Sequence, residues 1–339
     1  MQYTTLGRTG CKVSRLCLGT MNFGPHTTET DSYAIMDEAL KLGINFFDTA
    51  DVYGWKKGEG VTEQIIGRWW AQGGMRREKV VLATKVHGDM DADPADITMK
   101  RGLSALKIRR ACENSLKRLQ TDYIDLYQMH HIRRETPVDE LLQAFDVLIK
   151  QGKIIYVGSS NFAGWDIAKY NEIAKHLGHV GLVSEQSKYS LACRNIESEV
   201  LPACQAYGVG VIPWSPLDGG FVSGVLSDPD KKRRANEGMQ KRIEKERGRL
   251  QAWEDFCNSI SQKPADVALA WVLHHPAITA PIIGPRTLDQ LAGNIKSVDI
   301  KLDEAQLKAI DRIWPGPKGQ TDEGIADWKK QEAPEVYAW

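Results

Sequence analysis

The sequence lacks an excess of charge of either sign. Its 339 residues include 44 Lys plus Arg and 44 Asp plus Glu, so the formal net charge at pH 7 is zero. A balanced chain creates no overall field that would attract nucleic acid or an anionic membrane. We therefore expect neither as a partner, and any phosphate-bearing ligand has to be held by local groups.

Long apolar runs and cysteine motifs are also missing. No run approaches the roughly 20 apolar residues that a bilayer span needs, and residues 1–7 lack the charged and apolar regions of a signal peptide. The six cysteines show no Cys-x-x-Cys spacing, which argues against a zinc ribbon or a disulfide framework. These absences predict a cytoplasmic protein with reduced cysteines.

The sequence does contain a regular alternation of apolar and amphipathic segments. The apolar segments predict eight buried strands at residues 15–20, 45–49, 80–85, 124–129, 156–159, 182–186, 209–214 and 280–284. Segments of helical period follow at residues 31–42, 62–70, 107–119, 138–151, 163–176, 196–207, 265–274 and 287–295. Such alternation is typical of a parallel sheet with helical crossovers. Eight units favour an α/β protein with one domain over residues 1–339, folded as a (β/α)8 TIM barrel.

An open doubly wound sheet is the less favoured alternative. It would usually carry Gly-x-Gly-x-x-Gly after its first strand. Here the first strand is followed by Gly19-Thr-Met-Asn-Phe-Gly24, which does not match that pattern.

Three segments lie outside the eight units. Residues 2–16 contain two short extended runs around two glycines, which predicts an N-terminal β-hairpin that caps the barrel. Residues 221–254 are predicted to form a long loop insertion, helical over 241–253, and loops of this length are usually functional. Residues 303–314 predict an extra C-terminal helix, and residues 315–339 form a C-terminal tail.

Four side chains that hold or move protons follow successive predicted strands. Asp48, Lys85 and His130 come at or directly after strand ends, and Tyr53 lies just beyond Asp48. The carboxyl ends of barrel strands converge on one mouth, so we expect these side chains to meet. Asp48 can keep a buried Lys85 charged, and the charge should lower the pKa of Tyr53. With His130 as a hydrogen-bond donor, the set predicts protonation of a carbonyl oxygen while a hydride reaches the carbon.

A second set of polar residues follows the later strands. Ser160, Asn161 and Gln186 can hold a carboxamide, and Trp214 can stack on a flat ring. The glycine-bearing loop after Trp214 would let the backbone approach a pyrophosphate. Beyond strand eight, Arg286 offers a fork for phosphate at the start of a helix.

These residues resemble the aldo-keto reductase superfamily from residue 6 to about residue 314. The matching motifs are Phe47-Asp-Thr-Ala-x-x-Tyr-Gly54, Thr84-Lys85, Asp125-Leu-Tyr-Gln-x-His130, Gly158-x-Ser-Asn-Phe162, Gln186-x-x-Tyr-Ser190, Trp214-Ser-Pro-Leu217 and Gly284-x-Arg-Thr287. The last motif is similar to the microbial branch that includes relatives of the potassium-channel β subunits. The resemblance implies a (β/α)8 barrel that reduces carbonyls with NADPH and without a metal.

The resemblance also implies roles for individual positions. Asp48, Tyr53, Lys85 and His130 would be the catalytic four, with Tyr53 as general acid. The nicotinamide would be held by Ser160, Asn161 and Gln186 and would stack on Trp214. Further implied cofactor contacts are Gly19, Thr20, Met21, Ser215, Pro216, Leu217, Gly219, Gly284, Arg286, Thr287, Gln290 and Asn294. Among these, Arg286 and Thr287 would bind the 2′-phosphate.

The substrate pocket is expected above Tyr53. Strand-end position places Phe23, Trp55 and His131 around it, together with Met21. The substrate is then a small carbonyl compound, and the sequence leaves open an aldehyde, a ketone or a keto-sugar. A homo-oligomer is compatible with the sequence. Under this interpretation the insertion 221–254 lies near the cofactor, and it could close over the cofactor, form a subunit contact or stay mobile.

Two other classes of function are alternatives for this sequence. A metal-dependent hydrolase barrel would use His130 or His131 with His87, but adjacent histidines on a strand point to opposite faces and no His-x-His follows strand one. A cofactor-binding regulatory subunit with little turnover would keep the same fold. The complete catalytic four argues for turnover.

Overall fold

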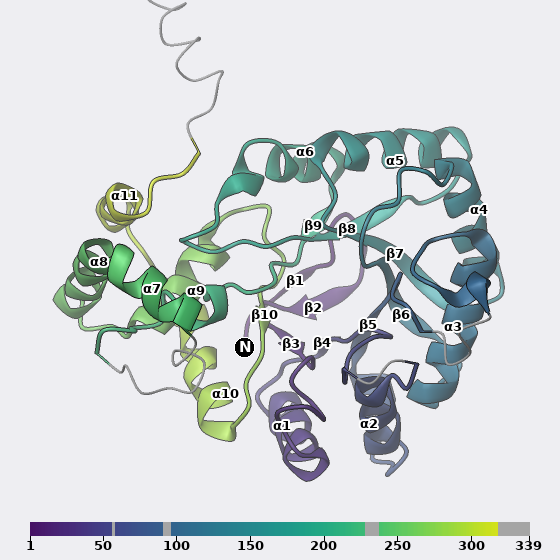
Figure 1. The fold of residues 1–339 in the computed structure, drawn as a ribbon, viewed down its shortest axis with the longest axis horizontal. Coiled ribbons are helices and arrows are strands. Elements are labelled where there is room, and N and C mark those ends of the chain that lie inside the picture. Colours follow the sequence, from purple (N-terminus) through teal and green to yellow (C-terminus); the bar gives the residue numbers. More distant parts are fainter. Residues whose placement is uncertain (56–57, 91–95, 228–236, 318–339) are drawn as a thin grey trace, which may run out of the picture.

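The centre of the protein is a sheet of eight parallel strands (Figure 1). The computed structural model describes residues 1–55, 58–90, 96–227 and 237–317. The strands are β3 (Cys17–Gly19), β4 (Phe46–Asp48), β5 (Val81–Val86), β6 (Ile124–Met129), β7 (Ile154–Ser160), β8 (Leu182–Gln186), β9 (Gly210–Val211) and β10 (Ile282–Ile283). Neighbours follow chain order, and β10 pairs with β3.

Backbone hydrogen bonds at β9 close this sheet into a barrel. The Val211 amide donates to the Ala277 carbonyl at 3.1 Å, and the Thr279 amide donates to the Val211 carbonyl at 2.8 Å. A parallel bridge also joins Val211 to Ile278, just before β10. The predicted (β/α)8 barrel is therefore confirmed.

The last two strands are shorter than the sequence predicts. β9 and β10 have two residues each, where six and five were expected. The segment that follows β9 still runs beside the segment that follows β8, because Trp214 forms a parallel bridge with Lys188. β7 begins two residues earlier than predicted, since Ile154 pairs with Ile124 of β6.

Helices surround the sheet as a ring (Figure 1). They are α1 (Glu29–Lys41), α2 (Val61–Trp70), α3 (Ala105–Leu119), α4 (Val138–Lys150), α5 (Gly164–His176), α6 (Val200–Tyr207), α9 (Pro264–His274) and α10 (Leu288–Ile295). Thr28 and Ser104 cap α1 and α3 by accepting hydrogen bonds from amides three residues on. The segment predicted as one helix over 196–207 is divided, because Glu199 has an extended φ of −143° and α6 begins after it.

Short 3-10 helices complete the connections. They are η1 (Arg77–Lys79), η2 (Ile97–Met99), η3 (Asn195–Glu197), η4 (Asp218–Gly220) and η6 (Lys296–Asp299).

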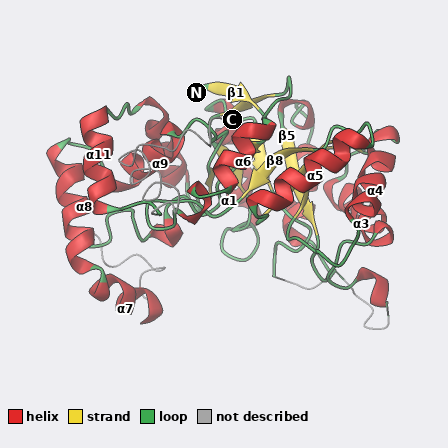
Figure 2. Cartoon of the chain, turned by 90° about the horizontal axis from the view of Figure 1, so that it is seen from above, coloured by secondary structure: helices red, strands yellow, loops and turns green. Residues whose placement is uncertain are grey.

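The N-terminal hairpin closes one end of the barrel, as predicted. β1 (Tyr3–Thr5) pairs antiparallel with β2 (Lys12–Ser14). Leu6 and Val13 of the hairpin are fully buried and pack with Phe46 of β4, Leu126 of β6 and Ile212, which directly follows β9. Seen from the side, β1 lies at the end opposite to α7 (Glu237–Lys245), so the strand ends that carry the polar residues face away from the hairpin (Figure 2).

The segment 221–254, expected as a loop, is largely helical where the structure describes it. α7 is followed by α8 (Arg247–Ser259), and the two are separated at Glu246, whose φ is −102°. The single helix expected over 241–253 is therefore two helices. Residues 228–236 of this insertion lie outside the described residues.

The C-terminal helix and tail follow the barrel. The extra helix is confirmed as α11 (Glu304–Ile313), which packs beside α8. Most of the predicted tail, residues 318–339, lies outside the described residues. Within the described ranges, no helix is long and apolar enough to cross a membrane.

Candidate active site

The Lys85 side chain is the centre of a buried polar network at the end of β5. Its Nζ donates to Asp48 Oδ2 at 2.7 Å, to the Thr49 carbonyl at 2.8 Å and to the Tyr53 hydroxyl at 3.2 Å. Burial favours the neutral amine, but Asp48 and Tyr53 outweigh burial and raise the pKa of Lys85. The ammonium therefore stays charged although the residue has no exposed surface.

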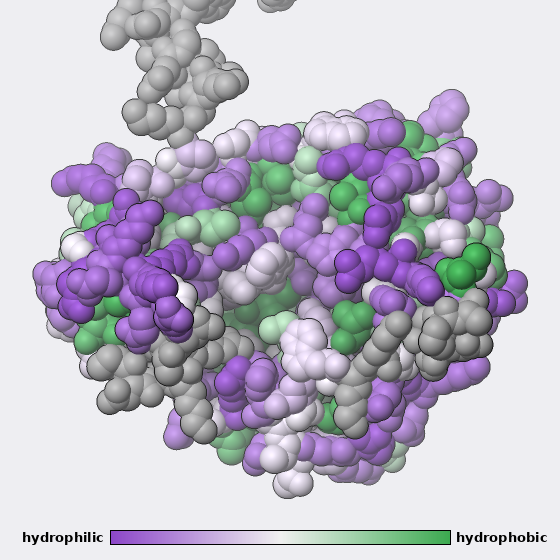
Figure 3. Space-filling model, in the orientation of Figure 1, coloured by the Kyte–Doolittle hydropathy of each residue, from purple (hydrophilic) through white to green (hydrophobic). Residues whose placement is uncertain are grey.

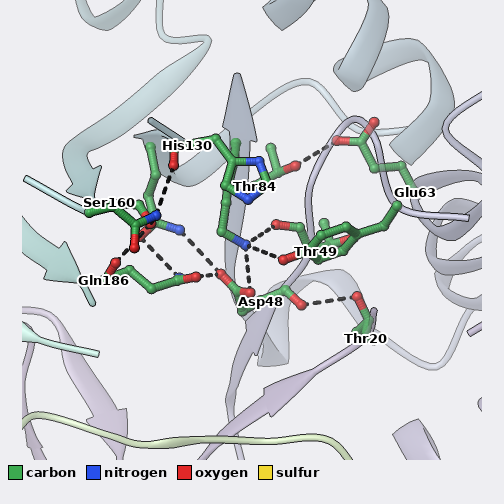
Figure 4. A network of polar contacts seen from close by, with 12 residues as sticks. Thr20, Asp48, Thr49, Glu63, Thr84, His130, Ser160 and Gln186 are labelled. Atoms are coloured by element: carbon green, nitrogen blue, oxygen red, sulfur yellow. Dashed lines mark hydrogen bonds and ion pairs between the residues drawn. The ribbon is translucent and has the colours of Figure 1, made fainter. Parts of the chain in front are cut away.

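The second oxygen of Asp48 is held from the opposite side. Asp48 Oδ1 accepts from Gln186 Nε2 at 2.8 Å and from Gln128 Nε2 at 3.2 Å. Asp48, Gln186, Ser160 and His130 consequently lie around one centre, where the ends of four strands meet (Figure 4). Loops after these strands border a hollow on this face of the molecule (Figure 3).

Tyr53 lies beside the charged lysine with its proton retained. Burial raises the pKa of Tyr53, Asp48 adds to the rise, and Lys85 opposes it. We expected the lysine to lower this pKa on balance, and that expectation is wrong because the loss of hydration outweighs one nearby cation. A raised pKa keeps the phenol protonated at neutral pH. Tyr53 therefore carries the proton that a general acid would need.

His130 presents a neutral ring to the same site. Burial, with help from the charge of Lys85, lowers the pKa of His130 well below its ordinary value. Its ring packs edge-on to Tyr53 with centroids 5.9 Å apart. A neutral imidazole donates one hydrogen bond and accepts one, so His130 can orient an oxygen without adding charge.

The two adjacent histidines lie together. His130 and His131 stack with centroids 4.9 Å apart and planes 9° apart. We expected them on opposite faces of a strand, but β6 ends at Met129 and the strand rule no longer applies beyond it. The His87 ring packs edge-on against His131, with ring centroids 5.0 Å apart. Within the described ranges, however, no three His, Cys, Asp or Glu side chains form a group that could hold a metal.

The residues expected at the nicotinamide are joined to each other. Ser160 Oγ donates to the Gln186 carbonyl at 2.8 Å, and Asn161 Nδ2 donates to Ser160 Oγ at 3.0 Å. Trp214 Nε1 donates to Asn161 Oδ1 at 3.0 Å, which brings the indole from the β9 end to the β7 end. Because Gln186 also binds Asp48, these residues and the four that we expect to be catalytic form one network.

Several residues other than glycine at this end of the barrel have a left-handed backbone conformation. Asn161 and Ser215 have φ values of 60° and 51°, and Trp55 has 60°. Side chains other than glycine rarely adopt this region, and such residues gather at functional sites. The loop that carries Ser215 also includes the buried Pro216, the partly buried Leu217, and Gly219 at φ 68°.

Ion pairs fasten this loop to the rest of the protein. Asp218 contacts Lys188 at 2.7 Å and Arg242 of α7 at 2.6 Å. The two cations overcome burial and lower the pKa of Asp218. α7 therefore lies against the loop that the sequence assigns to the pyrophosphate.

The expected phosphate residues lie at the start of α10. Thr287 caps this helix by accepting from the Gln290 amide at 3.3 Å, and the Gln290 side chain accepts from the Arg286 amide at 2.8 Å. Arg286 Nε donates to Asn22 Oδ1 at 3.4 Å. Gly284 is exposed beside these residues, and Asn294 is partly buried on α10.

Several predicted positions have internal contacts instead of open surface. Gly19 has no room for a side chain, since a Cβ would lie 2.4 Å from Ile282 Cγ2. Thr20 is buried and donates to the Asp48 carbonyl at 2.9 Å. The expected pocket residue Phe23 is wholly buried in the core between sheet and helices. Met21 and Trp55 are 39% and 59% exposed, so they can meet a ligand.

Gln128 is the main site residue that sequence reasoning missed. It lies two residues before His130 on β6, and Leu126 on the same face points into the barrel. Strand alternation could have found it. Glu185 was also missed: it is buried and accepts from the Phe162 amide, next to Asn161, at 3.2 Å. Burial raises the pKa of Glu185 to about 7.

Asp51, which lies between Asp48 and Tyr53 in the sequence, has a buried carboxyl group. Neither of its oxygens has a hydrogen-bond partner among the described residues. Burial, with repulsion from Glu63, raises its pKa to about 7. In an unfolded chain the pKa is about 3.9. Between about pH 3.9 and about pH 7 the Asp51 carboxyl therefore holds its proton in the folded protein and loses it in the unfolded chain. The free energy of unfolding falls as the pH rises through this range.

We accordingly expect Asp51→Asn to stabilise the protein in a pH-dependent way. The gain in free energy of unfolding over the parent should grow by about 2 to 3 kcal/mol from pH 5 to pH 8, the window set by the raised pKa. Urea unfolding at both pH values measures it. Asp255→Asn, at an exposed site on α8, is the matched control. A gain that is equal at both pH values would contradict the explanation.

The site is thus a barrel mouth with a buried lysine–aspartate pair, a protonated tyrosine and a neutral histidine. Comparison with known sequences identifies the class of protein. The model of the Aldo/keto reductase family matches residues 15–315. The chain belongs to the aldo/keto reductase family.

Three relatives illustrate this membership. The chain is 54% identical over 347 residues to "Uncharacterized oxidoreductase YrpG" of Bacillus subtilis (strain 168), with 100% of each chain covered. It is 32% identical over 345 residues to "Protein tas" of Escherichia coli (strain K12), covering 94% of this chain and 99% of the relative. It is 30% identical over 336 residues to "Versiconal hemiacetal acetate reductase" of Aspergillus parasiticus, covering 92% and 96%.

Proposed function

We propose that the protein is an oxidoreductase that reduces an aldehyde or ketone to an alcohol with NADPH. When bound, NADPH would supply the hydride for the carbonyl carbon. The carbonyl oxygen takes a proton from Tyr53, so that one hydride and one proton make the alcohol. The observation that carries the proposal is the contact of a protonated Tyr53 with the charged, Asp48-bound Lys85.

The residues of this chain divide the work. Tyr53 gives its proton, and Lys85 at 3.2 Å stabilises the phenolate that remains. Asp48 keeps the lysine charged. His130 can donate a hydrogen bond that orients the carbonyl oxygen toward Tyr53.

The residues at the mouth fit a nicotinamide dinucleotide. Amide and hydroxyl groups of Ser160, Asn161 and Gln186 match a carboxamide, and the Trp214 indole offers a flat face. Arg286 at the start of α10 offers a charged fork and helix amides to a phosphate. Names of relatives that contain "reductase" or "oxidoreductase" agree with this assignment.

A direct test uses purified protein, NADPH and 4-nitrobenzaldehyde. We expect loss of NADPH absorbance with formation of the alcohol at a steady rate. Tight binding of NADPH, seen by quenching of tryptophan fluorescence, without turnover on a panel of aldehydes, ketones and keto-sugars would favour a regulatory subunit instead. Stoichiometric zinc in the active protein would contradict the reductase proposal.

Arg286→Ala should separate the two nicotinamide cofactors. A guanidinium that binds the 2′-phosphate helps NADPH only, so we expect KM for NADPH to rise about tenfold while KM for NADH changes little. Steady-state kinetics with both cofactors measure this. Arg312→Ala, at an exposed arginine of α11, is the control. An equal loss for both cofactors would remove Arg286 from the 2′-phosphate.

A further inference from the structure

A second hollow opens on the same mouth of the barrel, beside the histidines. It has a volume of about 320 Å³ and lies between η2, the start of α3 and the loop after β6. Four cations, Lys100, Arg101, Lys107 and Arg133, line it together with one carboxylate, Glu135. The Lys107 ammonium is buried and donates to the carbonyls of Gly88 and Met99. We call the group Lys100, Arg101 and Arg133 the basic pocket.

The basic pocket is built directly on the strand that carries Lys85. His87 comes two residues after Lys85, and its carbonyl accepts from the Gly102 amide at 3.0 Å. Arg133 comes three residues after His130, and its Nε donates to His87 Nε2 at 3.1 Å. Both walls of the pocket therefore start at the ends of β5 and β6, next to the catalytic residues.

A row of rings leads from the proton donor to this pocket. Tyr53, His130, His131 and His87 are in contact in that order, with centroids 5.9, 4.9 and 5.0 Å apart. His131 is exposed along this row. A molecule whose carbonyl lies at Tyr53 could lie along the rings and reach Arg133 with its other end.

Among the described residues that line the pocket, the one carboxylate neutralises little of the charge of the basic pocket. Glu135 is 78% exposed on its side chain and stays 3.9 Å from Arg133, so that pair is weak. The positive end of α3 adds to the field. Burial, together with the charges of Arg101 and Arg133, lowers the pKa of both His87 and His131. The rings therefore stay neutral, and the net charge comes from the arginines and Lys100.

We propose that the basic pocket binds an anionic group of the substrate, a carboxylate or a phosphate, while the carbonyl of the same molecule lies at Tyr53. This inference rests on the proposed function and specifies the substrate class. The substrate would be a carbonyl compound whose acid group is separated from the carbonyl by at least an aromatic ring or a chain of similar length.

Matched pairs of substrates test the proposal. We would compare kcat/KM for 4-carboxybenzaldehyde with its methyl ester, and for 4-(4-formylphenoxy)butanoate with its methyl ester, using NADPH. At least one acid should be preferred over its ester by about tenfold, the effect of one good guanidinium–carboxylate pair. High salt should reduce the preference. The kcat/KM for 4-formylphenyl phosphate, compared with that for 4-carboxybenzaldehyde, tests whether phosphate is preferred to carboxylate.

Variants assign the preference to the pocket. Arg133→Gln and Arg101→Gln should lower kcat/KM for the acids to the level of the esters and leave the esters unchanged, which also reports intact folding. Arg109→Gln is the matched control, because Arg109 is an exposed residue of α3 outside the pocket.

The outcomes separate the two proposals. Equal kcat/KM for every acid and its ester would overturn the basic pocket and leave the carbonyl reductase standing. An acid preference that survives both variants would also overturn it. No turnover of acids or esters would overturn the proposed function, and this inference with it.

Discussion

Replacing Tyr53 by Phe should lower kcat for reduction of 4-nitrobenzaldehyde by about a thousandfold or more while NADPH still binds. A positioned proton donor contributes about 10²- to 10⁴-fold, and here the donor is also next to the charged Lys85 that stabilises its anion. The phenyl ring keeps the packing against His130 and the Lys85 ammonium, which lies 4.8 Å from the ring centroid. The loss should therefore appear in kcat and not in folding.

The measurement needs turnover and binding on the same preparation. Single-turnover kinetics give the chemical step, and fluorescence titration gives the dissociation constant of NADPH. Tyr3 of the hairpin lies at the other end of the barrel, and its hydroxyl donates to the Gly43 carbonyl, so Tyr3→Phe should leave kcat unchanged. Turnover of Tyr53→Phe within a few-fold of the parent would rule out Tyr53 as the general acid.

Replacing Lys85 by Met should cost both activity and stability. The side chains of Lys85 and Asp48 are only 0% and 3% exposed. Lys85 Nζ lies 2.7 Å from Asp48 Oδ2. Removal of one partner leaves a buried carboxylate without its cation, which typically costs about 3 to 5 kcal/mol of unfolding free energy. Activity should be lost as well, because no cation then stabilises the Tyr53 phenolate.

The double variant Lys85→Met with Asp48→Asn separates these two losses. An asparagine carries no charge to leave unpaired, and its side chain can still meet Gln128 and Gln186. Chemical unfolding should show that most of the lost stability returns, whereas NADPH-dependent turnover stays absent. Recovery of activity in the double variant would show that the lysine is structural, and a double variant as unstable as Lys85→Met would contradict the buried-charge explanation.

The meeting of the candidate catalytic residues at one mouth could be predicted because strand geometry is local. Asp48, Lys85 and His130 each follow a short apolar run, and parallel strands in a barrel place such positions at one mouth. The same alternation would have added Gln128. The (β/α)8 barrel, its hairpin and the final helix followed from periodicity for the same reason.

The electrostatic state of the site could not be predicted in this way. The pKa of Tyr53 depends on how far burial exceeds the effect of Lys85, and the sequence contains no measure of burial. The stacking of His130 on His131 depends on where β6 ends. The two helices of the insertion depend on partners such as Asp218, which pairs with Arg242 across 24 positions of sequence.

The sequence by itself determined the fold class, the family resemblance and the set of candidate catalytic residues, because these rest on periodicity and on the order of residues along strands. Only the tertiary structure decided which of these residues touch, which stay charged and which are buried in the core, as Phe23 is. It also decided that Arg101 and Arg133, 32 positions apart, line one pocket beside the histidines. The physical reason is that charge, hydration and packing depend on distances through space, which the order of residues along a chain does not contain.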